Sequence, residues 1–307
     1  MKNHMAENDK MTVALTGGTG YIARSLLEHE ASETVRCRAV SRNPRAGWAS
    51  PAIEWATVPS YDDRAGLASA FAGARFVIHL ADNASRHGQR HPEEALRNCD
   101  ALIDVAREAG IEGIVLASSL YARNAATAYG ASKRAIEDRF LAATDLKTII
   151  LRLPPVYGPG CKGGFAALAK LASKGFPLPL GAARAPRAYL SARNLSSLIC
   201  AIVKTPEQGW TSAAGRIFEP SDGTGVTTRD LAQMMSATRG RTPLLLPVPP
   251  ALLRAAGAAT GRSELMSSIL DRLESAPIGE LQEAFGWRPV EQMPASLSFL
   301  AQPSRRA

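Results

Sequence analysis

The sequence predicts an α/β protein with a Rossmann-type, doubly wound parallel sheet and a smaller C-terminal substrate-binding lobe. Three observations lead to this prediction. Short apolar runs of strand length alternate with helical segments through the first half of the chain. The first of these runs leads directly into a glycine-rich turn. After the sixth predicted strand, Pro and Gly become frequent and the strict alternation ends, which indicates a second lobe.

The first apolar run is followed by glycines and then by a helix, which is the order typical of a dinucleotide-binding turn. Residues 11–15 have the length of a buried strand, and residues 16–23 continue as TGGTGYIA. Gly17 and Gly20 would let the backbone turn tightly and approach a pyrophosphate, while the small Ala23 would let the helix pack against the strand. A flexible loop is the alternative, but it would need neither the strand nor the helical spacing that follows.

The second predicted strand, residues 35–40, ends where the adenosine ribose lies in a dinucleotide fold. An acidic residue is expected there to bind the ribose hydroxyls, but the sequence has Ser41. Arg42 and Arg45 follow, and an arginine can pair with a 2′-phosphate. The turn therefore favours NADP over NAD, although Arg42 could also be a solvated loop charge.

The strand and helix alternation continues as far as residue 152. Apolar runs at 76–81 and 113–119 are separated by a helix predicted at 92–109, and a sixth strand is expected at 147–152. Such alternation implies right-handed crossovers and ligands at the carboxyl ends of the strands. His79 lies inside one of these apolar runs, so we expect a buried histidine with a satisfied hydrogen bond.

The domain boundary is expected soon after the sixth strand, where prolines force an extended path. We predict an NAD(P)-binding domain over residues 11–177. Residues 178–307 should form most of the substrate-binding lobe and be interleaved with the last sheet strands. A chain of 307 residues can bury cores of this size.

Composition excludes several classes of protein. The net charge is +8 and the pI about 9.6, but the basic residues are spread singly along the chain, so we expect no nucleic acid partner. No apolar stretch is long enough to span a membrane, and no signal segment is apparent, which predicts a cytoplasmic protein. The four cysteines lack metal-like or redox spacing, so they are expected to be reduced and no metal site is predicted.

Tyr129 and Lys133 stand four residues apart in a predicted helix, so both side chains leave the same face. A positive charge beside a phenol favours the phenolate, and this makes a tyrosine a candidate general base. Taken alone, the pattern could be an ordinary helix surface. Its position downstream of the glycine turn supports the functional interpretation.

With these motifs in order, the chain resembles extended short-chain dehydrogenases/reductases of the NAD-dependent epimerase/dehydratase family. It is most similar to the subgroup of UDP-glucose 4-epimerases from surface-polysaccharide pathways. The resemblance covers nearly the whole chain. The further matching segments are His79 to Ala81, Asn98, Arg152 to Gly163, Phe176 to Gly181, Arg187 to Leu195, Leu246 to Pro250 and Gly286 to Pro289.

The resemblance implies a role for each matching residue. Tyr129 would take a proton from a sugar hydroxyl, Lys133 would bind the nicotinamide ribose, and hydride would pass to the nicotinamide ring. Tyr157 and Arg187 would contact the substrate, Arg187 through the nucleotide phosphates, although it could also be a surface arginine that opens a strand. The residues implied in cofactor binding are Gly17, Gly20, Tyr21, Ile22, Ser41, Arg42, Leu80, Ala81, Lys133 and Pro154. A homodimer is also implied.

Two departures from the family pattern affect the expected chemistry. Leu120 stands where the third residue of a Ser-Ser-Ser-like run usually supplies a catalytic hydroxyl. Ser119 is the nearest substitute, with Ser118 behind it, although both could simply end the strand. Only ten residues separate Ser119 from Tyr129, so the loop that usually contacts substrate is short.

Three functions remain compatible with these residues. The first is an epimerase-like oxidoreductase that acts on a UDP-sugar, with Tyr129 as the base. The second is an NADPH-dependent carbonyl reductase, which Ser41 and Arg42 favour. The third is a non-catalytic NAD(P)-binding regulatory protein, which Leu120 and the short loop would allow but which leaves Tyr129 and Lys133 unexplained.

Overall fold

The computed structural model describes residues 11–29, 35–43, 53–81 and 92–301. The chain divides into two compact units, each made of three segments. Unit 1 contains Met1–Leu153, Leu195–Pro220 and Ile278–Arg288, and unit 2 contains Pro154–Asn194, Ser221–Pro277 and Pro289–Ala307.

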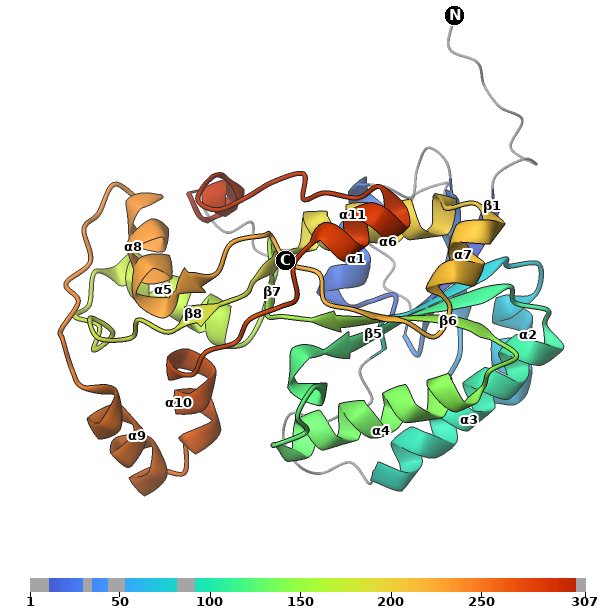
Figure 1. The fold of residues 1–307 in the computed structure, drawn as a ribbon, viewed down its shortest axis with the longest axis horizontal. Coiled ribbons are helices and arrows are strands. Elements are labelled where there is room, and N and C mark those ends of the chain that lie inside the picture. Colours follow the sequence, from blue (N-terminus) through green and yellow to red (C-terminus); the bar gives the residue numbers. More distant parts are fainter. Residues whose placement is uncertain (1–10, 30–34, 44–52, 82–91, 302–307) are drawn as a thin grey trace, which may run out of the picture. The chain divides into compact units, whose positions relative to one another are not determined.

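Unit 1 is built around a parallel sheet of seven strands in the order β10-β6-β5-β4-β1-β2-β3 (Figure 1). The order reverses next to β1, as in a doubly wound fold. The predicted fold class is therefore confirmed. The strands are β1 (Met11–Thr16), β2 (Val35–Ser41), β3 (Ile53–Thr57), β4 (Phe76–His79), β5 (Gly113–Ser119), β6 (Lys147–Leu153) and β10 (Ile217–Phe218).

Helices cover both faces of this sheet, which explains why its central strands are almost continuously apolar. In Figure 1, α2, α3 and α4 lie on one face, while α6, α7 and α11 lie on the other. The Ser196 hydroxyl donates to Ser25 and so joins α6 to α1. The helices are α1 (Tyr21–His29), α2 (Arg64–Phe71), α3 (Pro92–Glu108), α4 (Ala128–Ala142), α6 (Ala192–Lys204), α7 (Glu207–Ala213) and α11 (Gly279–Phe285), with a 3-10 turn η2 (Leu120–Ala122).

Unit 2 has short strands and a core of its own. Its two-stranded sheets pair β7 with β9 in parallel and β8 with β11 in antiparallel. Aromatic and aliphatic side chains including Tyr157, Phe165 and Leu231 form its core. Its elements are β7 (Val156–Tyr157), α5 (Gly164–Lys174), β8 (Pro186–Arg187), β9 (Leu190–Ser191), β11 (Val226–Thr227), α8 (Thr228–Ala237), α9 (Pro250–Ala259), α10 (Ser263–Leu270) and η3 (Ala295–Leu300).

The boundary between the units falls earlier than the sequence prediction at residue 177. Unit 1 is left at Leu153, where β6 ends and the prolines begin. The chain returns to unit 1 at Leu195 and contributes β10 to the edge of the sheet beside β6. Among the described residues, none of the helices combines the length and the apolar character needed to cross a membrane.

Candidate active site

The glycine turn between β1 and α1 lies close against two neighbouring strands. Gly17 has a φ of 72°, and its carbonyl accepts a hydrogen bond of 2.8 Å from the Gly20 amide. A Cβ added to Gly17 would lie 2.9 Å from the Ala81 nitrogen, and the Gly18 amide donates to the Val40 carbonyl at 3.0 Å. A side chain at Gly17 would therefore be both strained and sterically blocked.

A tyrosine from the segment after β3 holds this turn by hydrogen bonds. The Tyr61 hydroxyl accepts a hydrogen bond from the Gly17 amide at 3.2 Å and another from the Thr16 hydroxyl. Burial raises the pKa of Tyr61, although these two bonds and the charge of Arg42 act in the opposite direction. The phenol is therefore neutral at physiological pH and can hold the turn. No local sequence pattern indicated this contact, because Tyr61 is far from Gly17 along the chain.

His79 completes this buried group at the end of β4. Its Nδ1 lies 2.7 Å from the Thr16 hydroxyl, and its ring lies edge-on to Tyr61 with 5.9 Å between centroids. The expectation of a buried, hydrogen-bonded histidine is therefore met. Leu80 and Ala81 follow directly, and Ala81 is the residue that approaches Gly17.

The end of β2 carries a hydroxyl and a cation. Ser41 is buried, its hydroxyl lies 3.4 Å from that of Thr19, and it accepts from the Asn43 amide at 3.3 Å. Arg42 is exposed. Arg45 lies outside the described residues.

Helix α4 carries the predicted catalytic pair and begins with a side-chain cap. Thr127 is the N-cap and accepts from the Gly130 amide at 3.0 Å. A Cβ on Gly130 would overlap the carbonyl oxygen of Tyr121, so the glycine allows α4 to lie directly on η2. The short link between Ser119 and Tyr129 is thus folded against the start of α4.

Tyr129 and Lys133 lie together on α4, as their spacing predicts. The Lys133 Nζ is 5.9 Å from the centroid of the Tyr129 ring. Tyr129 is half-buried, whereas Lys133 is only 6% exposed. The Tyr121 ring contacts Tyr129 edge-on at 6.3 Å between centroids. A largely desolvated ammonium beside a partly accessible phenol is an arrangement that favours a general base.

The two serines at the end of β5 have different partners. The Ser118 hydroxyl donates to Glu137 at 2.5 Å and is buried. The Ser119 oxygen caps η2 by accepting from the Tyr121 amide at 3.4 Å, a bond that does not use the Ser119 hydroxyl proton. Leu120 is buried. Of these residues, only Ser119 keeps a hydroxyl proton that could be donated to a ligand.

Glu137 forms a buried ion pair one turn beyond Lys133. Its carboxylate is fully buried and accepts from Arg152 of β6, with Nη2 2.6 Å from Oε2 and Nε 3.0 Å from Oε1. Hydrogen bonding to Glu137 raises the pKa of Arg152 above its ordinary value. Together with Ser118, the pair fixes α4 against β5 and β6. Glu137 was not a predicted site residue, although its position four residues after Lys133 placed it on the same helix face.

The predicted substrate residues in unit 2 are both buried. Arg187 is 2% exposed and donates to the Asp271 carbonyl. Tyr157 is fully buried, and its hydroxyl donates to Asp222 at 2.7 Å and lies 2.5 Å from the Ser296 hydroxyl. Contacts of Arg187 and Tyr157 with a substrate stay predictions. Pro154, the first residue of unit 2, is also buried.

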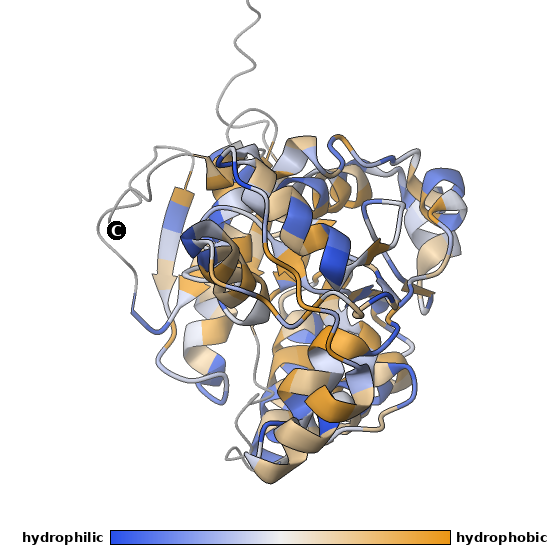
Figure 2. Cartoon of the chain, turned by 90° about the vertical axis from the view of Figure 1, so that its left-hand side faces the viewer, coloured by the Kyte–Doolittle hydropathy of each residue, from blue (hydrophilic) through white to orange (hydrophobic). Residues whose placement is uncertain are grey.

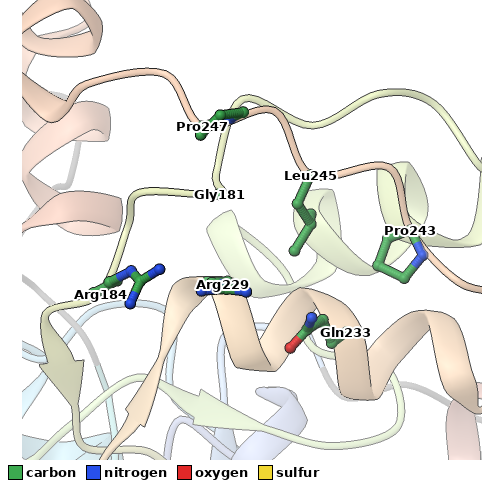
Figure 3. Close-up of a pocket in the computed structure, with 7 residues that line it drawn as sticks. All are labelled: Gly181, Arg184, Arg229, Gln233, Pro243, Leu245 and Pro247. Carbon is green, nitrogen blue, oxygen red and sulfur yellow. The ribbon is translucent and has the colours of Figure 1, made fainter.

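Unit 2 contains a cavity of about 290 Å³ between α8 and the segment that follows it (Figure 3). Arg184 and Arg229 approach it from one end, while Gln233 and Leu245 lie at the other. None of the predicted site residues lines it. The full lining is Gly181, Arg184, Arg229, Gln233, Pro243, Leu245 and Pro247.

The residues of unit 1 fit a nicotinamide dinucleotide. The Gly17 turn lets the backbone approach a pyrophosphate, and the start of α1 at Tyr21 and Ile22 can supply amides to its phosphates. Arg42 could face the adenosine ribose of such a ligand, and Lys133 could face its nicotinamide ribose. In the described part of the chain, no three His, Cys, Asp or Glu residues cluster as metal ligands would.

Comparison with protein families agrees with this geometry. The family model described as "NAD dependent epimerase/dehydratase family" matches residues 13–217. The chain belongs to this family. The match covers the glycine turn, the sheet from β1 to β10 and the Tyr129 and Lys133 pair.

Two relatives match this chain over different lengths. A UDP-glucose 4-epimerase from Vibrio cholerae is 31% identical over 178 residues, which is 57% of this chain and 52% of the relative. A ceramide reductase from Caulobacter vibrioides is 29% identical over 296 residues, or 93% of this chain and 88% of the relative. The chain thus spans about half the length of the epimerase.

Solved structures share the fold over nearly the whole chain. The UDP-glucose 4-epimerase of Thermus thermophilus, solved as a complex with NAD, has a TM-score of 0.71 and 22% identity. That match covers 95% of this chain and 98% of the other. The UDP-glucose 4-epimerase of Thermotoga maritima, solved with UDP-glucose, also has a TM-score of 0.71, with 17% identity and coverage of 95% and 97%. At these identities the likeness establishes the fold.

Proposed function

We propose that this family member is an NADP-using epimerase-like oxidoreductase that acts on a UDP-sugar, with Tyr129 as the base. The observation that carries the proposal is the Tyr129 and Lys133 pair, in which a 6% exposed ammonium lies 5.9 Å from the centroid of a half-buried phenol ring. The glycine turn in the same unit supports it. The relatives and neighbours named as UDP-glucose 4-epimerases support the substrate class.

Each residue of the pair has a defined task in this reaction. The Tyr129 phenolate would accept the proton of a sugar hydroxyl, and the Lys133 ammonium would stabilise that phenolate and bind the nicotinamide ribose. Ser119 would donate a hydrogen bond to the substrate oxygen, without giving up its proton, while its own oxygen remains bound to the Tyr121 amide. A bound nicotinamide dinucleotide would supply the hydride acceptor and donor. Arg187 and Tyr157 are proposed to contact the substrate, and Leu80, Ala81 and Pro154 the cofactor.

The test measures conversion of UDP-glucose by the purified protein without added cofactor, after a scan for bound nicotinamide absorbance. Formation of UDP-galactose would support the proposal. Tyr129→Phe should lower the rate by roughly 100-fold or more, because the base is lost. Tyr121→Phe is the matched control, since its ring contacts Tyr129 at 6.3 Å and it should keep most of the activity. Full activity of Tyr129→Phe would exclude the assigned base.

A second candidate function is an NADPH-dependent carbonyl reductase. It is favoured by the exposed Arg42 and by Ser41, which stands in place of the acidic residue that would bind ribose hydroxyls. The similarity to a ceramide reductase over 93% of the chain also favours it. Stoichiometric NADPH oxidation with a carbonyl substrate, without epimerisation of UDP-glucose, would replace the first function by this one.

Arg42 gives a direct test of cofactor choice that does not require a known substrate. Arg42→Ala should weaken NADPH binding by roughly 10- to 100-fold and NADH binding much less, because a charge-assisted hydrogen bond is lost. Arg97→Ala is the matched control for net charge, because the Arg97 side chain on α3 is exposed. Equal losses for both cofactors would contradict a 2′-phosphate contact. Tight cofactor binding without any turnover would instead support the regulatory alternative.

A further inference from the structure

Unit 2 exposes large apolar side chains on connected elements. Leu252 of α9 is 61% exposed, Leu244 is 58% exposed and Phe176 is 54% exposed. In the described part of unit 1, no large apolar side chain reaches comparable exposure. A protein rarely leaves such residues grouped in water unless a partner or a membrane covers them.

These side chains come from neighbouring segments. The Leu178 amide donates to the Leu244 carbonyl, and the Gly181 amide donates to that of Leu246, so the two segments run side by side. Leu245 points toward α8 in the close-up of Figure 3. Because side chains alternate along an extended segment, Leu244 and Leu246 face the other way, into solvent.

Helix α9 follows this segment and is exposed along most of its length. Its sequence, PALLRAAGAA, contains one charged residue, and only Gly257 is fully buried. Helix α10 packs against it and adds Leu265, which is exposed. In Figure 2, which faces this side of unit 2, the α9 and α10 region is largely in the orange and pale colours of apolar residues.

The same segments are strongly basic. Residues 170–176 and 238–265 contain six cations and a single acidic residue, Glu264. All six cations are exposed. Arg254 pairs with Asp271, Arg241 donates to the Ser173 carbonyl, and Lys174 lies over the Phe176 ring at 5.8 Å from its centroid. The cations are Lys170, Lys174, Arg239, Arg241, Arg254 and Arg262.

We propose that these segments, called here the docking face, bind the surface of an anionic lipid membrane. The face combines apolar side chains that can enter the headgroup boundary with cations that attract acidic lipids, which are the two properties that hold a helix at a membrane surface. Because the docking face carries an excess of positive charge, an anionic lipid surface is complementary to it. The proposal concerns peripheral binding and does not depend on the proposed catalytic activity.

The test is co-sedimentation of the full chain with vesicles. We expect binding to vesicles of equal parts phosphatidylglycerol and phosphatidylcholine, and weak or no binding to phosphatidylcholine alone. Binding should weaken as salt rises from 50 to 500 mM, because charge attraction is screened. Absence of binding to the acidic vesicles at 50 mM salt would overturn the proposal, as would equal binding to both vesicle types.

Two variant pairs separate the docking face from the net charge of the protein. Arg239→Gln/Arg262→Gln should weaken binding roughly 30-fold, because each basic residue near the surface contributes. Arg24→Gln/Arg97→Gln removes the same charge from α1 and α3 in unit 1 and should change binding little. If both double variants lose the same affinity for acidic vesicles, the attraction comes from the net charge of the whole protein. That result would exclude the docking face as the binding site.

The apolar contribution has its own matched control. Leu252→Ser should weaken vesicle binding roughly 10-fold, whereas Val290→Ser, which changes a 57% exposed residue outside the docking face, should not. Circular dichroism of each variant checks the fold. Sedimentation velocity without vesicles tests the other occupant: a dimer that Leu252→Ser dissociates would mean that a second copy covers the face, and would contradict the lipid assignment.

Discussion

Among the described residues, each unit buries one carboxylate, and the two are held in different ways. Glu137 in unit 1 is fully buried against the guanidinium of Arg152 and the Ser118 hydroxyl. Asp222 in unit 2 is 4% exposed and accepts only from neutral donors. These donors are the Tyr157 hydroxyl, the Ser191 amide and the Asn194 side chain.

The difference shows what a buried charge requires. A guanidinium that makes several bonds to a carboxylate offsets its loss of hydration, so the ion pair can fix α4. Neutral hydrogen bonds offset less, and burial raises the pKa of Asp222 although its three donors lower it. Burial and the Asp222 charge also raise the pKa of Tyr157. Unit 1 thus uses a charged pair and unit 2 a network that responds to pH.

The largest expected effect comes from removing the cation of unit 1. Arg152→Met leaves the Glu137 carboxylate buried without its counterion and should lower the free energy of unfolding by about 3–5 kcal/mol. Tryptophan fluorescence during urea unfolding measures this loss, because Trp210 and Trp287 belong to unit 1 and the sequence of unit 2 contains no tryptophan.

A double variant tests the reason for that loss. Glu137→Gln/Arg152→Met removes both charges and should recover most of the stability that Arg152→Met loses. If the double variant is less stable than the single one, packing of the two side chains outweighs their charges, and the comparison between the two carboxylates fails.

Removing the carboxylate of unit 2 should cost less. Asp222→Ala leaves three buried donors without their acceptor and should lower stability by about 2–3 kcal/mol. Asp222→Asn keeps the shape and should be affected less. Far-UV circular dichroism detects unfolding of both units, so a transition that tryptophan fluorescence does not follow belongs to unit 2, where tryptophan is absent. A loss as large as that of Arg152→Met would show that charge pairing does not distinguish the units.

A pH series gives the third test. The folded protein holds the Asp222 proton more tightly than the unfolded chain does, so this stabilisation is complete below the unfolded pKa and is lost as pH rises through the folded pKa. The stability of the wild type relative to Asp222→Asn should therefore fall between acidic and neutral pH, by about 1.4 kcal/mol for each unit by which the pKa is raised. A constant difference would contradict the raised pKa.

The smallest effect is expected at the surface. Arg107 binds Asp145 through two bonds of 2.6 and 2.7 Å, but both side chains are exposed. The pKa of Asp145 is lowered by this pair. Arg107→Gln should leave the urea midpoint within experimental error, since solvent screens such pairs. A clear shift would mean that burial is not what makes the Glu137 pair important.

Much of unit 1 could be predicted because its signals are local. The apolar runs at β1, β2, β4, β5 and β6 reflect burial on both faces of the sheet, and the glycines mark a turn whose backbone must approach β4. The spacing of Tyr129 and Lys133 placed them on one helix face. Their catalytic roles stay predictions.

Other features depend on tertiary contacts that no local pattern reports. Tyr61 binds Gly17, and Arg152 binds Glu137, because the fold brings together elements that are separate in the sequence. The predicted first domain ended at residue 177, whereas unit 1 ends its first segment at Leu153, where the composition changes. Interleaving of the later residues with the last sheet strands was expected, but the position of the returning strand was not, because β10 is two residues long and carries no periodic signal.

The place of β10 also governs when unit 1 can finish folding during synthesis. Ile217 pairs with Ile150, so the outer edge of β6 has no strand partner until the first segment of unit 2, Pro154–Asn194, and helices α6 and α7 have been synthesised. A nascent chain that ends near residue 153 presents an open parallel edge, which is a template for pairing with another chain. Since domains generally fold in order from the N-terminus, this late closure leaves the β6 edge open to misassembly until β10 is synthesised.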